Sequence, residues 1–388
     1  MAFAGAEIAG RLEGRPAARS SRAQVRAWLY LLAALVVLMV AVGGATRLTG
    51  SGLSITEWKP VTGAVPPLSD AAWAAEFDKY RASSQYQNLN RGMALPEFKT
   101  IYWWEWSHRQ LGRALGLVFV LPLVFFWWRG DLGRRKALAL LCIGALGGLQ
   151  ATVGWIMVAS GLQPGMTAVA PIKLTLHLLL ASLILAALVW MAIGTTAERS
   201  ARVPSHTEDA AASARPAVVL LALILVQIAL GGLVAGSKAG WTYNTWPLMD
   251  GRLVPPAEAL FAVRPWIENF VDNPALVQFQ HRVMAFVVVG FAIWHALRLR
   301  REPAGGEAGR RRATAVALLA LGQMALGIAT LILAVPLWAG LAHQLLAMGL
   351  LVAATAHARL SLGSEREWEA GSPHLQGAPA LARADGRR

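Results

Sequence analysis

The sequence predicts an all-α integral membrane protein. Eight transmembrane helices are expected to form two tandem, pseudo-symmetric four-helix bundles, with both termini in the cytoplasm. Three observations predict this fold: long apolar runs, basic residues in alternate segments, and an internal repeat. The 388-residue chain is 56% hydrophobic and 15% charged. A bilayer core needs about 20 apolar residues per helix, and eight runs meet that requirement: 27–46, 109–128, 137–158, 173–195, 216–236, 282–299, 313–335 and 337–359.

Two of these runs need a further argument. The seventh and eighth are separated only by Val335-Pro336-Leu337. Proline lacks a backbone N–H and clashes with the preceding turn, so we expect two helices joined by a tight turn rather than one very long helix. The first run follows a polar, arginine-rich segment, and we expect an uncleaved helix rather than a signal peptide.

The net charge of +14 is unevenly distributed. Lysine and arginine gather in the segments 11–26, 129–136, 199–215, 298–312 and 359–388. The positive-inside pattern places these segments in the cytoplasm and the loops 47–107, 159–172 and 237–280 outside. We therefore expect a multi-pass protein of the cell inner (plasma) membrane, surrounded by lipid. A basic cytoplasmic face accounts for the charge, so nucleic-acid binding is not expected.

The two halves of the chain align with each other. Gly43-Gly44 leads into a loop that closes at Pro66-Pro67, and Gly231-Gly232 leads into one that closes at Pro255-Pro256. Four membrane crossings separate the first and fifth helices, so both repeats have the same orientation in the membrane. The cores of such helix bundles commonly hold cofactors between facing helices.

The repeat also defines the expected domains. Each half contains a helix with the pattern Gln-x-x-x-Gly, from Gln150 to Gly154 and from Gln323 to Gly327. The terminal tails are rich in alanine, glycine and arginine, and we expect them to be disordered. The expected parts are a cytoplasmic tail, a first bundle, a cytoplasmic linker, a second bundle and a second tail, at residues 1–26, 27–198, 199–215, 216–360 and 361–388.

Four histidines lie near the outer ends of the even-numbered helices. Neutral imidazole binds haem iron, and two facing imidazoles complete a six-coordinate iron. One histidine at a membrane helix end is more often an interfacial hydrogen-bonding residue, but four that pair within a repeat favour haem ligation. We expect one haem between His108 and His177 and a second between His281 and His343, both toward the outer side. Four other histidines fall in or beside cytoplasmic segments, and we expect them to be solvated or to snorkel: His206, His295, His357 and His374.

Arg109 and Arg282 directly follow two of these candidate ligands. A guanidinium group pairs with a carboxylate through two parallel hydrogen bonds, so binding of the haem propionates is one interpretation. Hydrogen bonding to lipid headgroups is the other, and the sequence leaves both open.

One difference between the halves predicts where chemistry takes place. Glu105 stands three residues before His108, whereas Gln278 stands three residues before His281. Positions three apart share a helix face, so we expect the Glu105 carboxylate to point toward the haem of His108. A carboxylate can exchange a proton or stabilise a developing positive charge. We therefore assign the reaction to the N-terminal half, with Glu105 as catalytic residue, and electron transfer to the C-terminal half. A surface position for Glu105 is the alternative.

Four strings make the chain resemble the haem A synthase family over about residues 30–360. They are G-G-A-T-R-L-T-G-S-G-L-S-I-T-E-W-K-P at 43–60, E-W-S-H-R-Q-L-G-R at 105–113, G-W-T-Y-N-T-W-P-L-M-D-G at 240–251 and V-Q-F-Q-H-R at 277–282. The form in mitochondria and alphaproteobacteria is the most similar. Other bacterial branches carry a cysteine pair in the first outer loop. Residues 47–107 contain no cysteine, which excludes a thiol relay through this loop.

The resemblance implies an oxidoreductase that converts haem O to haem A for cytochrome oxidase. The C8 methyl group would be oxidised to a formyl group through successive hydroxylations. His281 and His343 match the ligands of a resident haem b, His108 and His177 match the pair at the substrate haem, and Glu105 matches the acidic residue beside it. Expected partners are haem O, an electron donor for which a ferredoxin-like protein is one candidate, haem O synthase and cytochrome oxidase assembly factors.

Two other functions compete with this one. A di-haem b electron-transfer cytochrome would use the four histidines equally well, but it would need neither Glu105 nor different loops in the two halves. A transporter would suit the repeat. However, transporter sites lie near the bilayer midplane on broken helices, and the distinctive residues here lie near helix ends.

Overall fold

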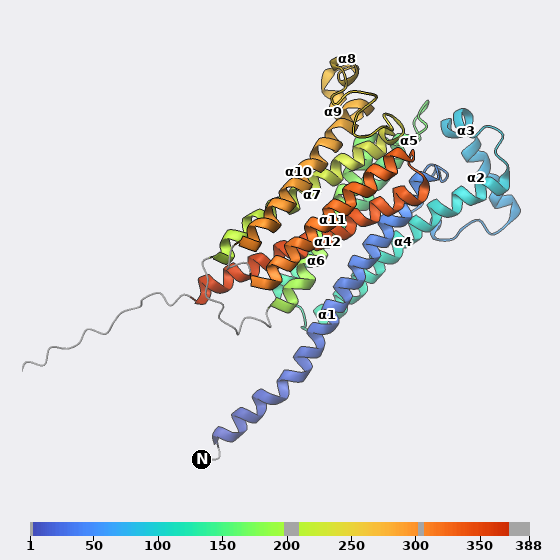
Figure 1. Cartoon of the computed structure of the whole chain (residues 1–388). Helices are drawn as coiled ribbons and strands as arrows, with labels where there is room; N and C mark the ends of the chain where they lie inside the picture. The colour runs from blue at the N-terminus through green and yellow to red at the C-terminus, as the bar shows by residue number, and fades with distance from the viewer. Residues whose placement is uncertain (1–2, 198–208, 302–305, 372–388) are drawn as a thin grey trace, which may run out of the picture.

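The computed structural model describes residues 3–197, 209–301 and 306–371, and this part of the chain is helical, without a β-strand (Figure 1). Eight of its helices are long and apolar enough to cross a membrane, which confirms the predicted helical membrane fold. They are α1 (Phe3–Leu48), α4 (Leu95–Trp128), α5 (Arg134–Gly161), α6 (Pro171–Ala197), α7 (Asp209–Gly236), α10 (Pro274–Arg301), α11 (Gly306–Ile332) and α12 (Leu337–Gly371).

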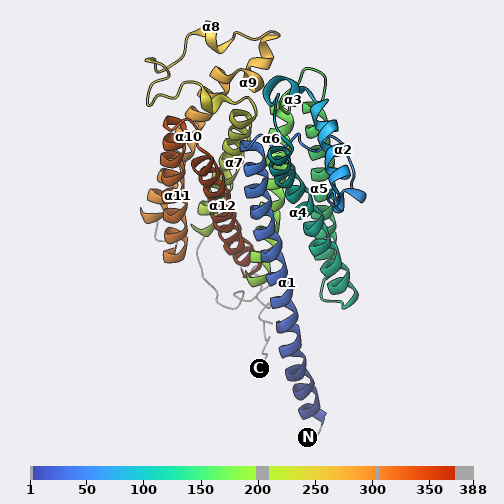
Figure 2. The same ribbon diagram turned by 90° about the vertical axis from the view of Figure 1, so that its right-hand side faces the viewer.

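The long helices form two groups that lie side by side (Figure 2). In the first group α1 packs against α4 and α6, and α5 packs against α6; in the second, α7 packs against α10 and α12, and α11 against α10 and α12. The groups meet through α6 with α7, α1 with α12, and α6 with α12. If α1 is matched to α7 and α6 to α12, the contact of α6 with α7 corresponds to the contact of α12 with α1. Such a correspondence is expected when a twofold axis relates the two groups of helices.

Glycines allow the closest approach between the groups. A Cβ atom on Gly236 of α7 would lie 2.5 Å from the Pro171 Cα at the start of α6. One on Gly232 would lie 3.0 Å from the Thr175 Oγ1. Because real side chains do not tolerate such distances to backbone, α6 and α7 can pack this closely only where these positions have no side chain.

The two groups differ in how tightly they close. α10 packs along the length of α11, whereas the equivalent pair, α4 and α5, makes few contacts. Where these two helices do meet, the Phe119 ring lies against Gly144, at 2.9 Å from the position of a Cβ atom. Large apolar side chains of α4 and α5 are exposed, as expected of surfaces that face lipid: Leu117, Val120, Leu121, Val124, Leu138 and Leu141.

The connecting segments gather at one end of the bundles, opposite the N-terminus (Figures 1 and 2). They contain η1 (Thr62–Ala64), α2 (Asp70–Arg81), α3 (Ser84–Leu89), η2 (Ala239–Trp241), α8 (Ala257–Leu260), η3 (Trp266–Glu268) and α9 (Asn269–Asp272). Tyr80 and Phe98, both fully buried, stack at 5.3 Å between ring centroids. This aromatic core joins α2 to α4.

That contact explains one correction. The apolar run predicted a helix from residue 109, with His108 at its first turn, but α4 begins at Leu95. Its first turns carry polar residues on one side and bury Phe98 in the aromatic core of the loops on the other. His108 therefore lies well inside α4, and the other three histidines lie about two turns inside their helices.

The ends of several helices also differ from the expectation. The predicted disordered N-terminal tail is wrong in part, since α1 begins at Phe3, and α12 continues into the expected C-terminal tail as far as Gly371. Alanine is the strongest helix former, which favours such extensions. The predicted break at Pro336 is confirmed: α11 ends at Ile332, and Ala334 and Val335 adopt left-handed backbone angles with φ of 56° and 58°.

His295 and His357 are not solvated, contrary to the expectation. Their side chains are 0% and 1% exposed, and the two Nε2 atoms lie 2.8 Å apart. Each stands 14 residues after a candidate haem ligand, His281 on α10 or His343 on α12. Fourteen residues are close to four helical turns, so these side chains return to the same interior face about 21 Å further along. His206 and His374 lie outside the described residues.

The His295–His357 contact is a hydrogen bond and not a second metal site. A metal ion between two imidazole nitrogens needs about 2 Å on each side, and 2.8 Å is too short for that. One ring donates its Nε2–H and the other accepts, so the neutral pair links α10 to α12 in the membrane interior, where polar contacts hold helices together.

We expect strong non-additivity between substitutions of this pair. Replacing either histidine by leucine leaves the other imidazole buried with a lost partner, at a cost of about 1–3 kcal/mol. The double variant removes both polar groups and should be little worse than one single variant. Unfolding of the detergent-solubilised protein by sodium dodecyl sulfate measures the free energy of unfolding of the two single variants and the double variant. If the losses of the two single variants add up in the double variant, the hydrogen bond is contradicted.

Candidate functional site

Each candidate haem ligand lies directly against a glycine of the long helix that precedes it in the chain. A Cβ atom at the glycine would lie 2.7–3.2 Å from the nearest imidazole atom. Such distances exclude any side chain unless the ring moves. The same unit, a glycine on one helix facing a histidine on the next, occurs four times: Gly43 with His108, Gly154 with His177, Gly231 with His281, and Gly327 with His343.

The structure brings the histidines together in the predicted pairs. His108 and His177 lie within electrostatic range of one another, as do His281 and His343. All four side chains are half-buried, in contrast with the fully buried His295 and His357. The iron ligation itself stays a prediction.

Glutamine side chains stand beside three of the four imidazoles. The Nε2 atom lies 3.3 Å from His177 Nε2 for Gln150, 3.1 Å from His281 Nδ1 for Gln227, and 3.1 Å from His343 Nδ1 for Gln323. The Oε1 atom of each glutamine is buried and has no hydrogen-bond partner in the described part of the chain.

Gln227 was missed by the sequence reasoning. The signal was present, since Gln227 precedes Gly231 by four residues, as Gln150 precedes Gly154. The motif had been recognised only in the third helix of each half. It also occurs in the first helix of the second half.

Glu105 is buried, with 3% of its side chain exposed, which excludes the alternative of a surface residue. Its Oε2 atom accepts hydrogen bonds from the Ser54 hydroxyl at 2.7 Å and the Ile55 backbone N–H at 2.8 Å. Its Oε1 atom accepts one from Arg109 at 2.7 Å. The carboxylate thus binds the first outer loop to α4, one turn before His108.

Gln278 occupies the equivalent place and likewise contacts its loop and an arginine, but its hydrogen bonds to the loop have the reverse polarity. It is 2% exposed. Its amide donates to the backbone oxygens of Ala239 and Thr242, at 2.7 and 2.6 Å. Its Oε1 accepts from Arg282 at 2.9 Å. The loop of the first half presents donors and that of the second half presents acceptors, which gives a structural reason for the Glu–Gln difference.

Arg109 and Arg282 also hold the loops in place. Arg109 donates to the backbone oxygens of Ile55 and Glu57, and Arg282 to those of Tyr243 and Leu248. These contacts of both guanidinium groups are all within the protein. Propionate binding by Arg109 and Arg282 stays a prediction.

The outer loop over the first bundle carries its own ion pairs. Glu57 contacts the ammonium groups of Lys59 and Lys79, at 2.5 and 2.7 Å. Hydrogen bonds from Lys59 and then Lys79 lower the pKa of the Glu57 carboxyl to about 2. A lowered carboxyl pKa stabilises the loop above its ordinary pKa, and this contribution is lost as the pH falls toward 2. These pairs therefore persist at neutral pH.

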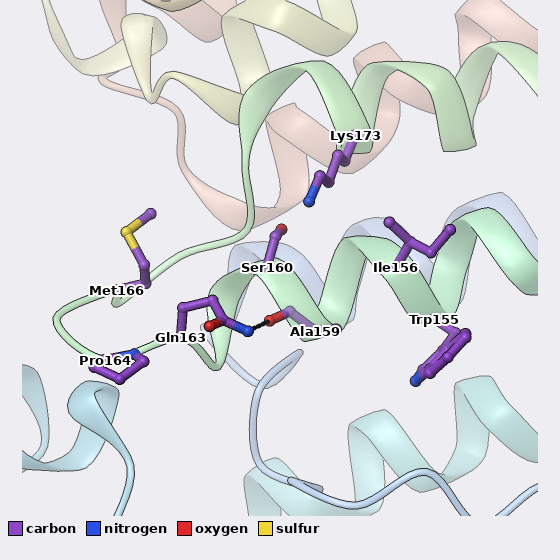
Figure 3. Close-up of a pocket in the computed structure, with 8 residues that line it drawn as sticks. All are labelled: Trp155, Ile156, Ala159, Ser160, Gln163, Pro164, Met166 and Lys173. Carbon is purple, nitrogen blue, oxygen red and sulfur yellow. Dashed lines mark hydrogen bonds between the residues drawn. The ribbon is translucent and has the colours of Figure 1, made fainter.

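A cavity of about 540 Å³ opens between the C-terminal end of α5 and the N-terminal end of α6 (Figure 3). Trp155, Ile156 and Met166 contribute apolar walls, and Lys173 extends into the space. Lys173 precedes His177 by four residues and so lies on the same face of α6. No carboxylate of the described residues pairs with Lys173. This cavity therefore combines an apolar wall with one cation next to the candidate site.

Comparisons with known proteins identify the family of the chain. The family described as cytochrome oxidase assembly protein (COX15-CtaA) matches residues 26–355. The chain is 64% identical to the "Heme A synthase" of Methylorubrum populi, over 94% of each chain. It is 64% identical to that of Methylobacterium radiotolerans, over 87% of this chain and 90% of the relative. With that of Azorhizobium caulinodans it shares 51% identity, over 92% and 97%.

The two loop anchors give a matched pair of substitutions. Glu105→Gln places an amide N–H among the donors of Ser54, Ile55 and Arg109, and Gln278→Glu places a carboxylate among backbone carbonyls. Glu105→Gln should weaken its loop anchor by about 1.5–3 kcal/mol, the usual value of a hydrogen bond to a charged group. Gln278→Glu should weaken its anchor because a carboxylate has no N–H to donate to the carbonyls of Ala239 and Thr242. Limited proteolysis of the first and second outer loops measures the effect. If both loops in both variants resist proteolysis as well as they do in the parent protein, this account is contradicted.

Proposed function

We infer, from the premise that this chain belongs to the COX15-CtaA family of cytochrome oxidase assembly proteins, that it is a haem A synthase. The identity of 64% to a named relative over 94% of both chains carries this conclusion. In detail, we propose an oxidoreductase that takes haem O as substrate, oxidises its C8 methyl group by successive hydroxylations, and delivers haem A.

The residues present suit a haem in each half. Four glycines leave bare backbone beside the imidazoles, where any Cβ atom would fill the space. Three buried glutamine oxygens lack partners in the described part of the chain. We propose that His281 and His343 would hold a resident haem b, and that His108 and His177 would hold the substrate haem. Bound haem b supplies one-electron transfer.

The chain's own residues would prepare the reaction in the first bundle. Glu105 lies three residues before His108, and its buried carboxylate would hold or move a proton near the substrate or stabilise a positive charge developing on it. Ser54, Ile55 and Arg109 fix the position of that carboxylate. The loop that they anchor would cover the outer end of the site and limit the access of water.

A di-haem electron carrier remains the second candidate, because the same glycine–histidine unit occurs in both halves. The first bundle differs from the second in ways that a carrier would not need. It closes less tightly between α4 and α5, and it has Glu105 at the place of Gln278. These differences support an exchangeable substrate in the first bundle.

The location and partners follow from the same proposal. We propose that the protein lies in the cell inner membrane with its loop-rich end, and both haem sites, toward the periplasm. Haem O synthase, cytochrome oxidase assembly factors and an electron donor of ferredoxin-like type are the expected partners.

Pigment analysis of purified variants tests the division between the halves. His281→Ala should lose haem b. His108→Ala should keep haem b, because the second site remains intact, and it should form no haem A. Acid–acetone extraction followed by mass spectrometry identifies each pigment. Haem A formation in the His108→Ala variant would contradict the assignment of the substrate site.

Substitution of one glycine should act through its histidine. Gly327→Ala places a Cβ atom 2.7 Å from the His343 ring, and we expect the haem b content to fall about tenfold or more, as for other groups that orient metal ligands. Gly322→Ala, on the same helix with nothing within 4 Å, is the control and should retain full haem b. The absorbance ratio of haem to protein measures both, and equal ratios would contradict the close fit.

A further inference from the structure

One side chain distinguishes the four glycine–histidine units from each other. Four residues before the facing glycine, three of the helices carry glutamine and the fourth carries methionine. The glutamines belong to the units of His177, His281 and His343. The methionine belongs to the unit of His108. The four pairs are Gln150 before Gly154, Gln227 before Gly231, Gln323 before Gly327, and Met39 before Gly43.

The two glutamines of the second bundle make the same contacts. Each donates from Nε2 to the backbone oxygen of its histidine, at 3.2 Å for Gln227 with His281 and 3.0 Å for Gln323 with His343. Each Nε2 atom also lies 3.1 Å from the Nδ1 of the same ring. Both imidazoles of this bundle therefore have an amide beside Nδ1.

The first bundle has this support at one imidazole at most. Gln150 lies 3.3 Å from the Nε2 of His177. Met39 instead packs its terminal methyl group against α4, 3.1 Å from where a Cβ atom of Gly112 would lie. Methionine and glutamine have similar length, so Met39 fills the corresponding space. A thioether donates no hydrogen bond and accepts only weakly.

This difference affects how strongly an imidazole binds iron. Groups that orient a metal-binding imidazole typically change metal affinity by about 10- to 100-fold. Gln227 and Gln323 each restrain their histidine through the bond to its backbone oxygen and the contact with its ring. Met39 has no N–H to donate and offers His108 no such restraint.

We propose that Met39 makes His108 the weakest of the four ligands, so that the haem of the first bundle can be exchanged while that of the second stays bound. This rests on the proposed function and deepens it: Met39 is a positioning residue that acts through His108. Two imidazoles whose backbone and ring are both contacted by a glutamine retain the resident haem. The substrate is held by His177, which a glutamine contacts only at Nε2, and by His108, which has no glutamine beside it.

The test compares Met39→Gln with Gln227→Met, which exchange the two side chains between equivalent positions. Release of haem from the purified, detergent-solubilised protein to apomyoglobin gives the dissociation rates, and the pigment mass identifies which haem leaves. We expect Met39→Gln to slow release of the farnesylated haem about tenfold, and Gln227→Met to speed release of protohaem about tenfold. The midpoint potential of the first-bundle haem should also fall in Met39→Gln, because an imidazole held more firmly on the iron stabilises the ferric state.

Met39→Leu is the control for packing and should behave as the parent protein. Unchanged release rate and potential in Met39→Gln would overturn the proposal, as would a Met39→Leu variant that changes both, since the sulfur itself would then matter. Failure of the proposed function looks different. The parent protein would then contain no farnesylated haem, while the rates of protohaem release would still report the effect of Met39.

Discussion

The structure depends on the close contact between an imidazole ring and a helix backbone without a side chain. At four places the ring of a histidine stands where a Cβ atom of the neighbouring helix would be. This contact requires two consecutive long helices to run antiparallel at a short separation. The fold is therefore four copies of one helix pair, and the position of each ring follows from the packing of its pair.

The loops complete what the helix pairs begin. Glu105 and Gln278 each connect an outer loop to the helix of a histidine, and an arginine four residues later does the same. The two anchors are equivalent in position, accept alike from their arginine, and are opposite in the polarity of their hydrogen bonds to the loop. The contacts of Glu105 therefore give it an architectural role and fix its orientation, and both are compatible with the catalytic role proposed for it.

Much of the fold follows from the apolar runs, since bilayer thickness sets the length of each helix and proline sets the break before Leu337. The pairs in which the four histidines lie could be predicted because the repeat doubles a signal that one histidine would not carry, while haem binding by these pairs stays a prediction. The early start of α4 could not, because it depends on the burial of Phe98 among loop aromatics. His295 and His357 were missed for a related reason: their basic surroundings in the sequence resemble a surface, whereas the 14-residue spacing returns them to the interior.

The loose contact between α4 and α5 has a consequence for how a ligand reaches the first bundle. A porphyrin with a long isoprenoid chain is poorly soluble in water and partitions into acyl chains. Under the proposed function, a side of the bundle that faces those chains would let such a molecule enter by diffusion in two dimensions, and its supply would then depend on membrane area rather than on aqueous concentration. The second bundle, in which α10 packs along α11, would offer no comparable route to the surrounding lipid phase.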